Sequence, residues 1–81
     1  MKMNRIHDDE QGTTTYKIPG FEFEAVLLKG ALPPALMGIH IQDKGGIVEA
    51  DVVPNESAES SAIKMLWNFY RGFAEGEVIA A

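Results

Sequence analysis

Four carboxylates occur as two pairs, and the members of each pair are two residues apart. Glu22 and Glu24 form one pair, and Glu49 and Asp51 form the other. Residues two apart on a β-strand point to the same face, so each pair presents two negative charges on one side of its strand. Such charges suit docking onto Lys and Arg clusters. The alternative is an ordinary solvated sheet face, which antiparallel sheets commonly have. A metal site is disfavoured because a hard cation needs several converging oxygens, and we expect neither a metal nor a cofactor.

The remaining reactive side chains do not form a catalytic pattern. His7 and His40 are the only histidines, and they lack the short spacing of zinc-binding pairs. Ser57, Ser60 and Ser61 fall at the expected start of a helix, outside any Gly-x-Ser-x-Gly elbow. The glycine-rich patterns of phosphate-binding loops are also missing. The sequence therefore indicates a protein that is not an enzyme.

A second candidate contact surface lies near the C-terminus. Trp67 has Lys64 three residues before it and Arg71 four residues after it, so the three share one flank of a helix. Trp and Arg are enriched at the energetic centres of protein interfaces. The alternative is that Trp67 packs at the margin of the core, because large aromatic side chains dominate small cores.

An alternating hairpin positions the second carboxylate pair. Residues 38–53 read GIHIQDKGGIVEADVV, in which Asp43–Gly46 supplies the turn. A regular hairpin divides these strands into an apolar face and a polar face. The apolar face is expected to carry Ile39, Ile41, Val48, Ala50 and Val52. The polar face is expected to carry His40, Gln42, Glu49 and Asp51.

Further strands are expected before the hairpin. Thr13–Ile18 is rich in β-branched and aromatic residues, and Pro19-Gly20 separates it from a second strand at Phe21–Leu28. Lys29–Leu36 contains two consecutive prolines and is expected to be a loop. Residues 1–12 are either a flexible segment or a short edge strand.

The pattern changes to a helical period after the hairpin. Asn55 or Ser57 is a suitable N-cap, and apolar residues then recur at helical spacing as far as Phe73. Gly76 is expected to end the helix. Residues 77–81 are then a tail or a short extra strand built on Val78 and Ile79.

These elements predict an α+β domain over residues 13–81. Strands joined by short turns form an antiparallel meander of three to four strands, and the C-terminal helix packs on one face to give two layers. The helix is expected to cover Phe21, Phe23, Ile39, Ile41, Val48 and Val52. The opposite face is expected to be largely acidic, with Lys17, Glu22, Glu24, His40, Gln42, Glu49 and Asp51.

Composition restricts the partners. The 81 residues contain 7 Lys and Arg against 12 Asp and Glu, a net charge of −5. This balance disfavours direct binding to nucleic acid or to an anionic membrane. No cysteine is present, and no apolar targeting segment or membrane span is recognisable, which together favour a cytoplasmic location.

We therefore expect a small acidic intracellular protein that occludes a basic, nucleic-acid-handling surface of a partner protein. In size, charge and lack of catalytic motifs it is similar to inhibitors from bacteriophages and mobile elements, such as anti-CRISPR proteins. The expected contact residues are Glu22, Glu24, His40, Glu49, Asp51, Lys64, Trp67 and Arg71. The alternative is a self-assembling module that forms a homodimer. A small enzyme or ligand-binding subunit, with a pocket around Tyr16, Tyr70 and His40, ranks last.

Overall fold

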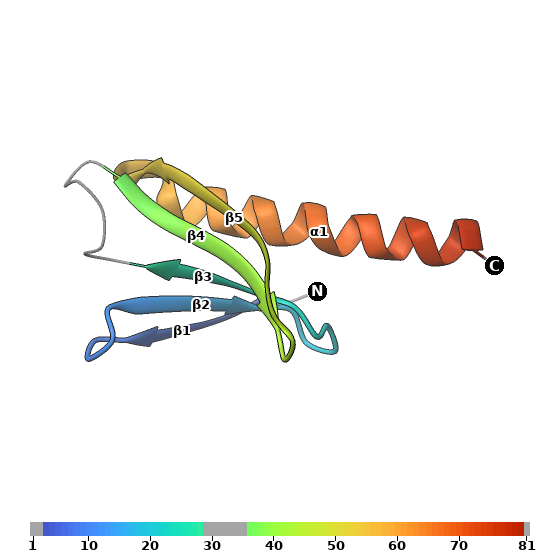
Figure 1. Cartoon of the computed structure of the whole chain (residues 1–81), viewed down its shortest axis with the longest axis horizontal. Helices are drawn as coiled ribbons and strands as arrows, with labels where there is room; N and C mark the ends of the chain where they lie inside the picture. Colours follow the sequence, from blue (N-terminus) through green and yellow to red (C-terminus); the bar gives the residue numbers. More distant parts are fainter. Residues whose placement is uncertain (1–2, 29–35, 81) are drawn as a thin grey trace.

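Five antiparallel strands form a meander in which each strand pairs with the next one along the chain (Figure 1). The computed structural model describes residues 3–28 and 36–80. Its elements are β1 (Asn4–Asp8), β2 (Thr13–Lys17), β3 (Glu24–Leu28), β4 (Leu36–Asp43), β5 (Gly46–Pro54), the 3-10 turn η1 (Asn55–Ser57) and α1 (Ala58–Ala80). The α+β two-layer architecture is confirmed, with one strand more than the upper expected number. The additional strand is β1, which forms one edge of the sheet.

Helix α1 covers one face of the sheet and packs chiefly on β3 and β4 (Figure 1). Ala58, Ala62 and Leu66 recur every four residues and are fully enclosed, so they form the stripe that faces the strands. The two small alanines let the helix backbone approach the sheet closely. The sheet contributes the other members of the core, which are Tyr16, Ile18, Phe23, Ala25, Leu27, Ile39 and Ile41.

The connection between β2 and β3 is a tight turn. Gly20 adopts a positive φ of 83°, and the N–H of Phe21 donates to the carbonyl of Ile18 at 3.0 Å. Strand pairing resumes only at Glu24, so the expected strand start at Phe21 is wrong by three residues. The turn leaves Phe21 and Phe23 beside the helix, where the ring of Phe23 lies 4.9 Å from that of Phe69.

A single extra residue interrupts the hairpin between β4 and β5. Near the turn, Gln42 pairs with Ile47, whereas beyond it Ile41 pairs with Glu49. Val48 therefore has no partner on β4, which is the arrangement of a β-bulge. A slip of one residue moves every later side chain to the other face of the sheet.

The bulge overturns the expected assignment of faces on β5. Residues directly opposite in antiparallel strands share a face, and Ile39 pairs with Asp51 as Ile41 does with Glu49. Glu49 and Asp51 therefore lie on the helix side of the sheet. Val52 pairs with Gly38 and lies on the outer side, so the prediction that α1 covers Val52 is wrong.

The outer face is consequently not a largely acidic surface. Its central row runs across four strands through Thr15, Val26, His40 and Ala50, in register. Val26 and His40 are both buried, at 6% and 8% exposure. Of the four paired carboxylates, Glu24 alone belongs to this face, where it lies opposite Lys17 and Gln42.

Helix α1 continues to Ala80, so neither expected feature of the C-terminal segment is correct. Gly76 does not end the helix, and Val78 and Ile79 belong to it instead of to a strand. A glycine inside a helix costs about 1 kcal/mol relative to alanine, which does not by itself stop a helix. The expected loop at Lys29–Leu36 falls outside the described residues, except for Leu36, which begins β4.

We predict that Leu66→Ala lowers the free energy of unfolding by about 2–5 kcal/mol, because it empties a fully buried site under the helix. Ile47→Ala, at a position that is 61% exposed, is the matched control and should change stability by no more than about 0.5 kcal/mol. Urea unfolding followed by circular dichroism measures both. Equal losses in the two variants would contradict the placement of the core.

Candidate functional site

The structure does not bring the four expected carboxylates together on one face. Glu22 is exposed and precedes β3, Glu24 points to the outer face, and Glu49 and Asp51 are exposed on the helix side of β5. The extra residue in β5 separates Glu49 and Asp51 from Glu24, and the late start of β3 leaves Glu22 outside the sheet. The negative charges therefore belong to two surfaces, of which the helix side carries the complete Glu49 and Asp51 pair.

On the outer face, Glu24 belongs to a chain of hydrogen bonds. His40 Nε2 lies 2.8 Å from Oε1 of Gln42, and Nε2 of Gln42 donates to Oε2 of Glu24 at 3.1 Å. The other carboxylate oxygen of Glu24 lies 3.7 Å from Nζ of Lys17. This arrangement satisfies the buried His40 ring and engages both oxygens of Glu24 within the fold. The polar contacts thus link β2, β3 and β4.

The helix flank with Trp67 is divided between core and solvent. Trp67 is partly buried, packs against the core and meets Tyr70 edge to face at 5.8 Å. Lys64 and Arg71 are exposed, and Arg71 Nη2 donates to Oδ1 of Asn68 at 2.6 Å. The indole therefore serves the core margin, while the two cations remain at the surface beside it.

A cluster of aromatic rings beside the turn between β2 and β3 is partly open to solvent. We call Phe21, Phe23, Phe69 and Phe73 the aromatic strip. The rings of Phe69 and Phe73 lie 5.2 Å apart, and both are about 5 Å from Phe23, at 4.9 and 5.1 Å. Phe73 is nevertheless 43% exposed, and Phe21 and Phe69 are half-buried. The signal in the sequence is the turn at Pro19-Gly20, which delays β3 and leaves Phe21 outside the sheet.

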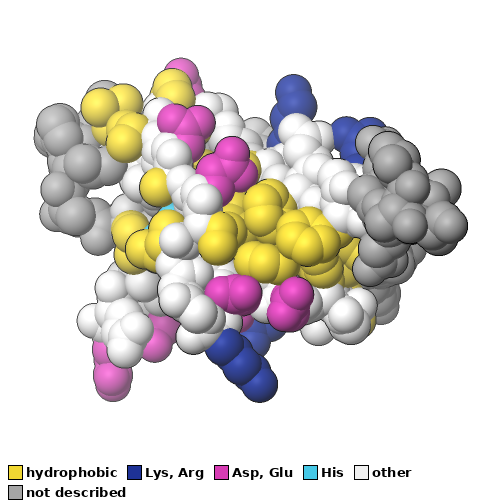
Figure 2. Space-filling view, turned by 45° about the vertical axis from the view of Figure 1, so that its right-hand side comes forward, with side chains coloured by type: hydrophobic (Ala, Val, Ile, Leu, Met, Phe, Trp, Pro, Cys, Tyr) yellow, Lys and Arg dark blue, Asp and Glu magenta, His cyan; other side chains and the backbone are white. Residues whose placement is uncertain are grey.

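Acidic side chains accompany this apolar surface. Figure 2 shows a continuous band of hydrophobic side chains across the middle of one face, with Asp and Glu side chains along both of its borders. An open hollow of about 350 Å³ adjoins the strip and is lined by Phe21, Phe23, Glu22, Glu24, Asp43, Lys17 and Lys44. The hollow thus combines aromatic surface with three carboxylates and two lysines, one of which, Lys17, pairs with Glu24.

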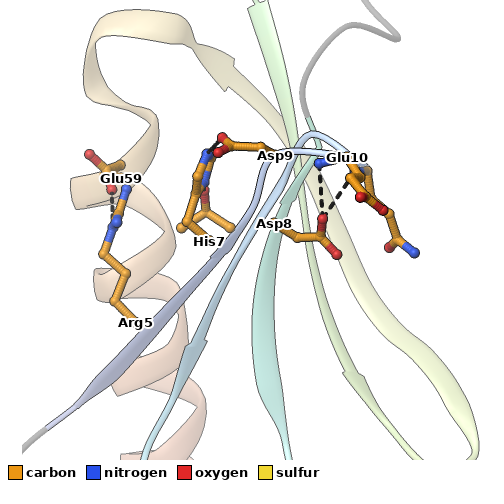
Figure 3. A network of polar contacts seen from close by, with 8 residues as sticks. Arg5, His7, Asp8, Asp9, Glu10 and Glu59 are labelled. Carbon is orange, nitrogen blue, oxygen red and sulfur yellow. Dashed lines mark hydrogen bonds and ion pairs between the residues drawn. The ribbon is translucent and has the colours of Figure 1, made fainter.

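A polar cluster at the start of α1 escaped sequence reasoning (Figure 3). One oxygen of Glu59, Oε1, accepts hydrogen bonds from Nε of Arg5 at 2.9 Å and from the hydroxyl of Tyr16. These bonds, that from Tyr16 above all, lower the pKa of the Glu59 carboxyl, whereas burial chiefly raises the pKa of Tyr16. In the sequence, Arg5 is 54 positions from Glu59 and Tyr16 is 43 positions from it. No local spacing in the sequence could reveal the contact.

The neighbouring turn between β1 and β2 is ordered by its own side chains (Figure 3). His7 Nδ1 lies 2.8 Å from Oγ1 of Thr14, and its Nε2 lies 2.7 Å from Oδ1 of Asp9. Oδ1 of Asp8 accepts the N–H groups of the next turn residues, Glu10 and Gln11.

These contacts form a row of hydroxyl, imidazole and carboxylate. The Thr14 side chain is buried, at 7% exposure, and the carboxylate of Asp9 is 92% exposed. The row differs in this respect from a Ser-His-Asp triad, in which the carboxylate that orients the imidazole is buried. Among the described side chains, those of residues 3–28 and 36–73, no three His, Asp or Glu residues gather as a metal site.

We predict a pH dependence of stability that depends on Glu59. Because its pKa is lowered in the folded state, its contribution is fully present above the ordinary carboxyl pKa of 4.5 and is lost as the pH falls through the lower folded value. Glu59→Gln should therefore flatten the fall in melting temperature between about pH 5 and pH 3. Thermal denaturation across this range tests the prediction. Glu56→Gln, which removes a charge from the adjoining turn η1, should keep the slope of the wild-type protein.

The comparisons with known proteins add no family to this geometry. Among the described residues, no helix has the length and apolar character needed to cross a membrane. No protein-family model matches the chain, and neither a curated protein nor a solved structure shows significant similarity to it.

Proposed function

We propose that the chain is a small protein-binding domain that covers an apolar and positively charged surface of a partner protein. The aromatic strip is the observation that carries this proposal, because Phe73 is 43% exposed although three other aromatic rings surround it. Exposed hydrophobic patches of this kind, with a polar border, mark interaction sites in soluble proteins.

The two parts of the surface have different roles in binding. Burial of Phe73 and of the exposed parts of Phe21 and Phe69 supplies affinity, since aromatic anchors contribute most of the binding energy at protein interfaces. The carboxylates on the helix side of β5, Glu49 and Asp51, attract Lys and Arg side chains and fix the orientation of the partner. The net charge of −5 acts in the same direction at longer range.

Occlusion of a basic surface would make the domain an inhibitor. Lys and Arg clusters that hold phosphates in nucleic-acid-handling proteins are equally able to hold carboxylates. A domain that occupies them with Glu49 and Asp51 competes with nucleic acid without binding it. This is the mode of action of an anti-CRISPR-like inhibitor encoded by a virus or mobile element, acting in the cytoplasm, where a chain without cysteine is well suited.

The test is capture of partner proteins from a bacterial lysate treated with nuclease. Proteins retained by the immobilised wild-type chain should be released as the salt concentration rises, because the contact is partly ionic. Phe73→Ser should weaken capture by about 2 kcal/mol, or roughly thirtyfold, as loss of an aromatic anchor does. The double variant Glu49→Gln with Asp51→Asn should weaken it as well, and quantitative mass spectrometry measures both effects.

Matched controls separate these effects from general damage. Leu36→Ser changes an apolar residue of similar exposure, 39%, at the far end of β4. Asp9→Asn with Glu10→Gln removes the same charge from the turn between β1 and β2. Both controls should retain the partner. Identical capture by all four variants would refute the proposed surface.

A further inference from the structure

We propose that the free edge of β5 binds an extended segment of the partner as a sixth strand, and that this segment carries Lys or Arg at alternate positions. The inference rests on the proposed function, since it specifies how the partner meets the carboxylates of β5. It concerns a backbone surface that is separate from the aromatic strip, so the two can be tested independently.

The edge of β5 is long and accessible. In the strand order β1-β2-β3-β4-β5, the two outermost strands are β1 and β5 (Figure 1). β5 has nine residues, of which eight are exposed, whereas β1 has five residues. Arg5 of β1 is already engaged with Glu59. Exposed edge strands of this length are templates for strand addition, which many peptide-binding domains use.

Two independent observations identify the backbone groups that face outward. The N–H of Val52 donates to Oδ1 of the neighbouring Asp51 at 2.8 Å, so this N–H points away from the β4 ladder. Pro54, two residues later, has no N–H and is tolerated only where the ladder needs none. Bonding alternates along an antiparallel strand, so Ala50 also directs its N–H and carbonyl to the free edge.

The side chains of β5 define the chemistry of the incoming strand. On the helix side, Glu49 and Asp51 are exposed and would lie opposite or diagonal to residues of the added strand. On the outer side, Ala50 and the half-exposed Val52 present apolar surface. A matching segment therefore alternates basic with apolar or β-branched residues. An ammonium group on Asp51 would also release the N–H of Val52 for the backbone of the partner.

The same charges disfavour a second copy of this chain as the occupant. Antiparallel pairing of two β5 strands centred on Ala50 sets each Glu49 against Asp51 of the second copy. Pairing centred on Asp51 sets that carboxylate against its own counterpart. Like charges directly opposite one another destabilise a strand pair. Net charge complementarity favours a basic segment instead.

The probe is a seven-residue acetylated peptide, TKVKTKV, titrated into the isotope-labelled full chain. Nuclear magnetic resonance should show shifts centred on residues 49–53. With the peptide at ten times its Kd, amide exchange of Ala50 should slow about tenfold. Replacing the three lysines of the peptide with glutamate should abolish binding. The variant Glu49→Gln with Asp51→Asn should weaken binding about fivefold, whereas the control Glu22→Gln with Glu56→Gln should not.

Methylated peptides test the strand geometry without altering the protein. Methylation of the peptide nitrogens that face β5 should abolish binding, and methylation at the alternate positions should preserve it. Equal effects of the two patterns would overturn strand addition. Shifts confined to the aromatic strip would overturn it too, while leaving the proposed function intact.

Two further outcomes would also overturn the inference. Binding of the glutamate peptide as tight as that of the lysine peptide would exclude the basic segment. Slow exchange of Ala50 without peptide, together with a dimer mass in sedimentation, would show that a second copy occupies the edge.

Discussion

The register of β5 depends on one unpaired residue, Val48, and the surface of the protein depends on that register. A hairpin without this residue would place Ile41 opposite Val48 and turn both carboxylates of β5 away from the helix. With it, Glu49 faces the helix side opposite Ile41, and Ala50 and Val52 move to the outer face. The bulge thus brings the negative charges of Glu49 and Asp51 to the same side of the sheet as the aromatic rings.

The helix completes this surface because its packing is asymmetric. The stripe of Ala58, Ala62 and Leu66 places α1 over the centre of the sheet, chiefly on β3 and β4. The helix side of β5 is left exposed, and the aromatic residues of the distal half of α1 extend past the enclosed core to Phe73. If the buried stripe of the helix consisted of bulky residues throughout, the helix axis would lie farther from the sheet. The small residues near the start of α1 and the large ones farther on account for a core that closes at one end and stays partly open at the other.

The fold was largely predictable from the sequence, whereas the arrangement of the surface was not. Alternation and turn residues fixed the strands around Pro19-Gly20 and Asp43–Gly46, and the period of 3.6 identified the helix. A bulge leaves no mark in such patterns, because IVEADVV alternates acceptably in either register. The expected outer face therefore failed on β5, where Glu49 and Asp51 lie on the helix side, and held for Lys17, Glu24, His40 and Gln42. The contact of Arg5 and Tyr16 with Glu59 was equally invisible, since it joins residues that only the tertiary structure brings together.

The meander has a consequence for the order in which the chain folds. Each strand pairs with its sequence neighbour, so the sheet can form by closing short loops, at a small entropic cost for each. The bonds from Arg5 and Tyr16 to Glu59 close the longest loops described above, and they form only after the helix has docked. Glu59 therefore links β1 and β2 to α1 through contacts that require the docked helix. Fraying of β1 at one edge of the sheet would consequently disturb the first turn of α1, which Arg5 contacts directly through Glu59.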